Sequence, residues 1–157
     1  MSKLYRKNVG IIVCKKGKVL LFARANTENF SWQFPQGGIE DNENLIEAGK
    51  RELYEETGIK NIKFIKKMPF SVKYDFPKNI KNPYLNKYAG QEQYWLLFEF
   101  LGDDNEIKFD NDQNCIEFKD FRWDNIDIAY DEIIDFKKEC YEKVIKYFKP
   151  FVEETSK

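Results

Sequence analysis

Three glutamates at helical spacing are the residues of this chain best placed to do chemistry. Glu52, Glu55 and Glu56 stand at positions i, i+3 and i+4, so a helix would bring their carboxylates onto one face. Like charges within one turn repel each other, and a hard cation such as Mg²⁺ or Mn²⁺, which takes oxygen ligands, would offset that repulsion. Taken alone, the same run also fits a solvated helix face. The spacing therefore predicts either a metal-binding face or a solvent-facing one.

Arg51 directly precedes these glutamates and can reach back to the loop before the helix. Glu43 lies in that loop. A guanidinium can bind a carboxylate through two parallel hydrogen bonds, which fixes geometry as well as adding energy. We therefore expect the pair Arg51 and Glu43 to hold the loop against the helix.

No histidine occurs among the 157 residues, and this excludes whole classes of catalyst. Hydrolases that depend on a Ser-His or Cys-His pair are ruled out, as are nearly all catalytic zinc sites. A carboxylate or a metal-bound hydroxide must then act as the base. The three cysteines, Cys14, Cys115 and Cys140, are far apart and odd in number. They predict a reducing, cytoplasmic location rather than a disulfide framework.

The net charge is only −1, yet charged residues are segregated along the chain. Residues 1–24 carry seven basic side chains and no acid, and residues 60–87 carry eight lysines with a single aspartate. Residues 40–56 and 99–120 are mainly acidic. If these blocks fold together, acidic and basic walls would face each other across one cleft, which suits metal-bound phosphate. The alternative is that the lysines simply solvate strand faces.

The elements that must position these residues can be predicted from pattern. Residues 9–14 and 19–23 are apolar and flank a turn at Gly17, which predicts a β-hairpin. Residues 45–57 predict a helix that ends at Gly58. The glycine inside this helix, Gly49, would let a strand or loop approach closely.

The remaining segments predict more strands and a final helix. We expect one or two strands over 62–74, a polar insertion over 77–90, a central strand over 93–101, a short strand over 106–109, another over 118–123, and a helix capped by Asp135 that runs to about Lys149, before Pro150. This order predicts one domain over residues 1–157, an α/β or α+β sandwich with a mixed sheet. No apolar run is long enough to cross a membrane.

The segment 37–59 resembles the Nudix box, G-x5-E-x7-R-E-U-x-E-E-x-G-U, in which U is apolar. Every fixed position is filled: Gly37, Glu43, Arg51, Glu52, Leu53, Glu55, Glu56, Gly58 and Ile59. The complete box favours the metal-binding interpretation of the glutamates. It implies an α/β fold of the Nudix type, an α/β/α sandwich with a mixed sheet, an internal catalytic helix and a C-terminal helix. Gly37, Gly38, Glu43 and Gly58 would be its structural residues.

Features outside the box are similar to the RNA pyrophosphohydrolases and to the asymmetric diadenosine tetraphosphate hydrolases. Trp32-Gln-Phe-Pro-Gln-Gly-Gly-Ile39 resembles the entry to their box, Tyr5-Arg6-x-Asn8-Val9-Gly10 resembles their N-terminal motif, and Gly90-Gln-x-Gln93-x-Trp95 resembles a later strand. The resemblance covers about residues 5–148. Lys7 departs from it, because the family usually has proline there.

The resemblance implies a role for individual residues. The catalytic set would be Arg51, Glu55, Glu56 and Glu117, and the metal ligands Glu52, Glu55, Glu56 and Glu117. Contacts to the 5′ phosphates or first nucleotides would come from Arg6, Arg24, Ser31 and Lys137. Phe136 would stack on a base. Helical spacing alone allows the other interpretation, that Phe136 is a core residue.

The reaction implied is hydrolysis, with Mg²⁺ or Mn²⁺, of the 5′-triphosphate end of RNA to a monophosphate. A box glutamate or Glu117 would take the proton from the attacking water. Hydrolysis of diadenosine tetraphosphate by the same site is an alternative, and a non-catalytic module that senses nucleotides is another, although the intact glutamates argue against it. Neither a membrane nor DNA is expected as a partner, and the sequence leaves the oligomeric state open.

Overall fold

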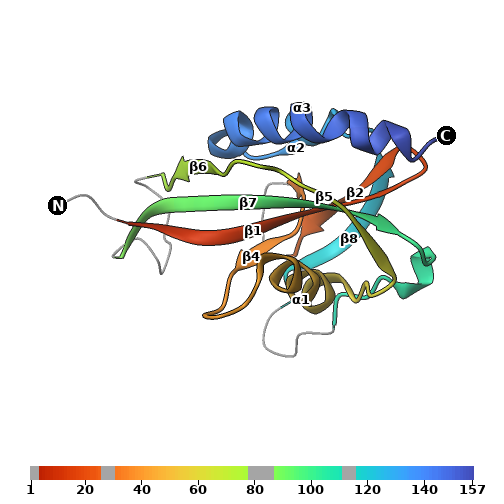
Figure 1. Ribbon diagram of the computed structural model, residues 1–157, viewed down its shortest axis with the longest axis horizontal. Coiled ribbons are helices and arrows are strands. Elements are labelled where there is room, and N and C mark those ends of the chain that lie inside the picture. Colours follow the sequence, from red (N-terminus) through yellow and green to blue (C-terminus); the bar gives the residue numbers. More distant parts are fainter. Residues whose placement is uncertain (1–3, 26–30, 78–86, 111–115) are drawn as a thin grey trace.

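A mixed β-sheet forms the centre of the protein, and helices cover both of its faces. The computed structural model describes residues 4–25, 31–77, 87–110 and 116–157. Helix α1 (Leu45–Thr57) lies on one face, and α2 (Ile128–Glu132) and α3 (Lys138–Glu154) lie on the other (Figure 1). The predicted α/β/α sandwich is confirmed.

Within the described segments, the sheet has eight strands. The main path runs β3-β2-β1-β7-β5, while β4 pairs with β1, β6 with β7 and β8 with β2. Their bounds are β1 (Leu4–Lys15), β2 (Lys18–Arg24), β3 (Trp32–Gln33), β4 (Gln36–Gly38), β5 (Ile62–Lys67), β6 (Val72–Asp75), β7 (Tyr88–Phe100) and β8 (Phe118–Asp124). Strands β1 and β7 are parallel, and the other described pairs are antiparallel. The sheet is therefore mixed, as predicted.

One edge of β1 is shared between two partners. Its C-terminal end, at Cys14 and Lys15, pairs with β2, whereas residues 8–10 pair with β4. The turn from β1 to β2 has positive φ at both Lys16 and Gly17, the backbone that a tight hairpin requires. The predicted hairpin is confirmed, and the change of partner along β1 separates β2 from β4.

Helix α1 begins and ends at the predicted residues. The Asn44 side chain accepts a hydrogen bond from the backbone N–H of Glu47 at 2.8 Å, which caps the first turn. Gly58 closes the helix in a left-handed conformation (φ 77°) and donates its N–H to the carbonyl of Tyr54. A Cβ on Gly49 would lie 2.7 Å from a methyl of Leu96 on β7. The bare glycine thus allows the predicted close approach of a strand.

Two strand predictions in the second half of the chain were wrong. Residues 106–109 form no strand. A single 3₁₀ turn, η1 (Asp104–Glu106), stands there, and the Glu106 carboxylate accepts the backbone N–H groups of Lys60 and Asn61. Strand β7 starts at Tyr88 rather than at residue 93, because parallel pairing with β1 extends it. Residues 78–86 of the expected insertion lie outside the described residues.

The final helix differs from prediction at both ends. Asp135 does not cap it: residues Asp135–Lys137 form a 3₁₀ turn, η2, and α3 begins at Lys138 without a side-chain cap. The helix continues through Pro150 to Glu154. Proline removes one backbone hydrogen bond there, but the next turn buries Val152 completely. Helix α2, which was not predicted, precedes the 3₁₀ turn.

The core consists of one apolar cluster on each face of the sheet. Trp95, Tyr141 and Phe148 belong to the cluster under α3, while Leu53 and Phe98 belong to the cluster under α1. The two helices are thereby fixed on opposite faces. Among the described residues, no helix combines the length and apolarity needed to span a membrane.

Candidate active site

A pocket of about 300 Å³ opens beside the part of β1 that pairs with β4. Its lining brings together three carboxylates and two arginines, all of them predicted site residues: Glu52, Glu56, Glu117, Arg6 and Arg24. Acidic and basic groups thus face each other across one cavity. Such a lining suits a polyphosphate accompanied by a cation.

Glu56 is the most buried of these carboxylates. Its Oε2 atom is buried and has no hydrogen-bond partner among the described residues. Burial, and secondarily the negative charges of Glu52 and Glu117, raise the pKa of Glu56 well above the ordinary value. A buried ionised carboxylate without a partner is costly. This carboxyl group will therefore hold a proton or bind a cation.

Glu52 lies one turn earlier and is held against β4. A Cβ on Gly37 would lie 2.1 Å from the Glu52 carboxylate, so any side chain there would have to displace this carboxylate. Burial raises the pKa of Glu52, opposed by a 2.9 Å hydrogen bond from Nη1 of Arg51. Gly37 and α1 together fix the position of this carboxylate in the pocket.

Arg51 joins helix α1 to the loop that precedes it. Its Nε donates to Oε2 of Glu43 at 2.8 Å, and its Nη2 donates to Oε1 of Glu43 at 3.0 Å. Nη2 also donates to the carbonyl of Gly38 at 2.9 Å. The guanidinium lowers the pKa of Glu43. The predicted two-pronged pair is observed, and it also fixes the end of β4.

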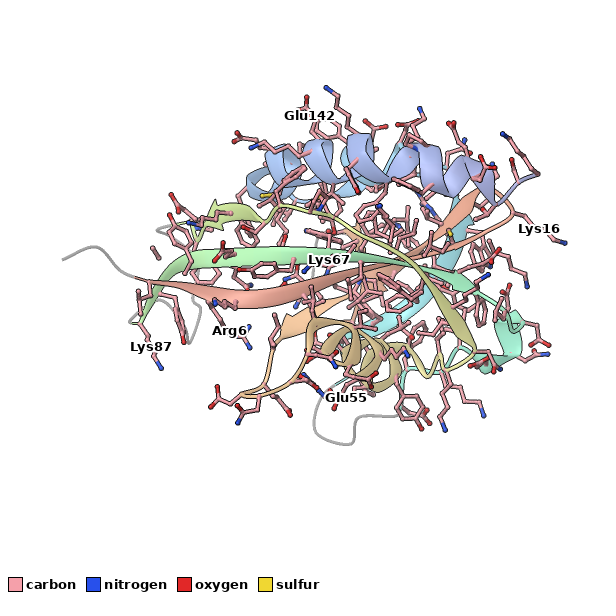
Figure 2. All side chains as sticks on the ribbon, in the orientation of Figure 1. Arg6, Lys16, Glu55, Lys67, Lys87 and Glu142 are labelled. Atoms are coloured by element: carbon pink, nitrogen blue, oxygen red, sulfur yellow. The ribbon has the colours of Figure 1, made fainter. Side chains whose placement is uncertain are left out.

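Glu55 lies apart from the other two box glutamates. Its carboxylate accepts a hydrogen bond from Nη1 of Arg51 at 3.3 Å. The side chain is 41% exposed and does not line the pocket. In Figure 2, Glu55 and Arg6 both lie on the α1 side of the sheet, and Glu142 projects from the outer surface of α3. Of the three glutamates at helical spacing, Glu52 and Glu56 therefore line the pocket and Glu55 does not.

These oxygen donors fit a hard divalent cation, and the unpartnered oxygen of Glu56 is the observation that supports it. Within the described segments, no three acidic side chains converge in the arrangement of a complete metal centre. Phosphate oxygens of a substrate commonly supply the missing ligands of such cations. The residues present therefore fit a cation that is shared with a bound phosphate.

The two arginines approach the pocket from different strands. A Cβ on Gly38 would lie 2.2 Å from Nη2 of Arg6, so the guanidinium of Arg6 rests directly on this glycine. Nη2 of Arg24 lies 3.7 Å from Oε2 of Glu117, with both side chains about 40% exposed. Ser31 accepts the backbone N–H of Arg24 through its carbonyl but does not line the pocket.

Phe136 and Lys137 differ from expectation. Phe136 is half-buried, packs against the cluster under α3, and has its ring centre 5.6 Å from that of Tyr74. Lys137 is only 5% exposed, and its Nζ lies 5.7 Å from the centre of the Tyr74 ring. Burial and the positive charge of Arg24 lower the pKa of Lys137 to about 8. The helix terminus that was expected to present both residues is replaced by η2.

A set of amide side chains in the pocket was missed by sequence reasoning. The lining also contains Asn8, Gln33, Gln36 and Gln91, and Gln93 donates to both Asn8 and Gln36. Gln91 in turn donates to the hydroxyl of Tyr74 at 2.8 Å. One signal was available: polar Gln91 and Gln93 alternate at the start of a strand whose later residues are apolar.

Comparison with known proteins agrees with this geometry. The model of the NUDIX domain matches residues 4–146. The chain belongs to the Nudix family. It is 36% identical, over 94% of both chains, to a protein of Bartonella bacilliformis named RNA pyrophosphohydrolase. The protein of the same name from Bartonella quintana is 41% identical, over 92% of this chain and 90% of that one.

The Nudix fold is also found by structural comparison. The Escherichia coli dihydroneopterin triphosphate pyrophosphohydrolase superimposes with a TM-score of 0.69 over 92% of this chain and 99% of that one, at 16% identity. At so low an identity the likeness concerns the fold. The Nudix box of this chain spans β4, the loop that follows it and α1, and β4 and α1 both line the pocket.

Proposed function

We propose that this protein is a metal-dependent hydrolase that converts the 5′-triphosphate end of RNA to a monophosphate. The observation that carries the proposal is the pocket in which Glu52, Glu56 and Glu117 face Arg6 and Arg24. Relatives that are 36–41% identical over most of the chain are named for this activity. An RNA substrate also fits the cytoplasmic location expected from the cysteines.

The polyphosphate would lie between the two arginines and the carboxylates. Arg6 and Arg24 would bind its non-bridging oxygens and stabilise the charge that grows on them during hydrolysis. Lys137, buried behind Tyr74, would add a third positive charge, and Phe136 would stack on the first base. Ser31 would contact the same end of the RNA.

Glu52 and Glu56 would hold a divalent cation in the pocket, with Glu55 and Glu117 completing the set; Mg²⁺ is the proposed ion and Mn²⁺ the substitute. Such a cation, when bound, neutralises phosphate oxygens and lowers the pKa of water. A carboxylate, from the box or Glu117, would take the proton of the attacking water, since no histidine is available. Arg51 would act indirectly, by fixing Glu52 and the loop.

The test is a direct comparison of substrates. Triphosphorylated RNA and diadenosine tetraphosphate are supplied to the purified protein with Mg²⁺, and kcat/KM is measured for each. We expect the larger value for RNA, with 5′-monophosphate RNA as product. A larger value for diadenosine tetraphosphate would identify a dinucleoside polyphosphate hydrolase. Binding without turnover of either would identify a nucleotide-sensing module.

A further inference from the structure

The guanidinium of Arg122, on β8, contacts residues of three elements and does not line the pocket. Its Cζ lies 4.7 Å from the ring centre of Trp32 on β3. Its Nη2 donates to Oε1 of Glu132 on α2 at 3.2 Å, and its Nε lies 3.3 Å from Oδ2 of Asp124 on its own strand. The side chain is one-third exposed.

The first of these partners, Trp32, is next in sequence to a residue that lines the pocket. Trp32 is followed by Gln33, which lines the pocket, and it is preceded by Ser31, whose carbonyl accepts the N–H of Arg24. Strand β3 has only two residues and pairs with β2 alone among the described strands. So short a strand has few backbone bonds to fix it, and the guanidinium of Arg122 lies over the ring of one of its two residues.

The second partner of Arg122, Glu132, lies at the start of the segment that leads to Phe136 and Lys137. Glu132 is the last residue of α2, and the chain passes from it through Ile133 to η2, which carries Phe136 and Lys137. Helix α2 has five residues and no side-chain cap, and it lies against β3. A helix of five residues is too short for its own hydrogen bonds to hold it in place, just as the backbone bonds of the two-residue strand β3 are too few.

We propose that Arg122 is a positioning residue for the substrate end. By stacking on Trp32 and pairing with Glu132, its guanidinium fixes β3 relative to the segment that carries Phe136 and Lys137. A guanidinium is planar, so its face can lie on an aromatic ring while the N–H donors at its edge bind a carboxylate. One side chain can thus make both contacts. The inference rests on the proposed function, because it takes these two segments to be the walls that hold the polyphosphate and the first base.

The experiment measures KM and kcat on a triphosphorylated RNA oligonucleotide with Mg²⁺. We expect Arg122→Gln to raise KM about 3- to 10-fold, the range of a partly desolvated cation–π contact, with kcat changed less than about twofold. Arg122→Lys keeps the charge but loses the planar fork, so its KM should rise by about 2- to 4-fold. The lysine variant also serves if the glutamine variant folds poorly.

A matched control is available at the other end of α2. Lys149 on α3 forms a 2.8 Å ion pair with Asp127, the residue before α2. Lys149→Gln should leave KM within about 1.5-fold of the wild type, as expected for an exposed ion pair. Melting temperatures of all variants are recorded, so that loss of stability is separated from loss of substrate affinity.

A double-mutant cycle with Glu132 gives the decisive result. Glu132→Gln should raise KM in the wild type but add nothing in the Arg122→Gln protein, because both changes remove the same link. A lower melting temperature for Arg122→Gln with KM equal to that of Lys149→Gln would overturn the inference. If the wild type does not hydrolyse RNA, the proposed function fails, and the same cycle on diadenosine tetraphosphate still tests Arg122.

Discussion

Glu56 combines burial, a raised pKa and an oxygen without a partner among the described residues. We expect Glu56→Gln to lower kcat by about 100-fold or more, because the amide keeps the size of the side chain but loses the charge that would hold a cation. The measurement is steady-state kinetics at saturating Mg²⁺, with circular dichroism to check the fold. Turnover close to that of the wild type would remove Glu56 from the site.

Gly38 provides a second test at the level of one atom. A methyl group there would lie 2.2 Å from Nη2 of Arg6, so Gly38→Ala must displace the guanidinium. We expect KM for triphosphorylated RNA to rise by about 5-fold or more, since a charge-assisted hydrogen bond is worth about 1.5–3 kcal/mol. Arg6→Gln is the reference: in its background, Gly38→Ala should have little further effect. Equal losses in both backgrounds would mean that Gly38 acts through something other than Arg6.

Sequence reasoning succeeded where the spacing itself determines the geometry. The pairing of Arg51 with Glu43 follows from a fixed loop and a helix of regular pitch. It did not place Lys137 among the buried residues and left Phe136 open between a stacking and a core role, because their exposure depends on where α3 begins and on the packing of η2 on Tyr74. The separation of Glu55 from the pocket was not foreseen either. Helical spacing says which residues share a face but not which part of that face a strand covers.

Among the elements, the loop between β4 and α1 is held mainly by Arg51. We expect Arg51→Ala to lower the free energy of unfolding by about 2–3 kcal/mol, since it leaves the half-buried carboxylates of Glu43 and Glu52 without their partner. Activity should fall as well, because the loop and Glu52 both lose their fixed position. Urea denaturation and kcat/KM measure the two effects. Arg51→Lys is the control, and it should recover little, because an ammonium cannot bind Glu43 through two parallel bonds.

In helix α3, by contrast, one substitution is expected to raise the free energy of unfolding. Pro150 is exposed and lies inside the helix, where it cannot donate to the carbonyl of Lys146. We expect Pro150→Ala to raise the free energy of unfolding by about 1 kcal/mol or more and to leave kinetics unchanged. Thermal denaturation is the measurement. An unchanged or lower melting temperature would show that proline does not disturb the helix, and that its rigidity in the unfolded chain outweighs the missing bond.

For the whole molecule, the raised pKa values of Glu56 and Glu52 make stability depend on pH. The folded state binds protons at these groups more tightly than the unfolded state does. Their contribution is therefore present below the unfolded carboxyl pKa and is lost as pH rises through the folded values. We expect these two groups to lower the free energy of unfolding of the metal-free protein as the pH rises above the ordinary carboxyl pKa of about 4.

The pH series is measured by urea denaturation in the presence of a chelator, for wild type and Glu56→Gln. The glutamine variant should show the smaller fall, since its side chain does not titrate. Glu43 acts in the opposite sense: its pKa is lowered by Arg51, so its contribution is lost as pH decreases. The difference between the two proteins isolates Glu56. Parallel curves would mean that its carboxyl is not the titrating group.

The parallel pairing of β1 with β7 determines when a newly made chain can become an enzyme. Arg6 contacts Gln91 across a separation of 85 residues, and both line the pocket. The caps of α1 and the pair of Arg51 with Glu43 join residues that are close in sequence, whereas Arg6 on β1 gains its partner on β7 only after the chain through β7 has been synthesised. Closing so long a loop costs entropy before any contact repays it, and pairings of this kind fold slowly. A ribosome-bound fragment that ends before β7 would therefore carry the whole Nudix box and still lack a pocket.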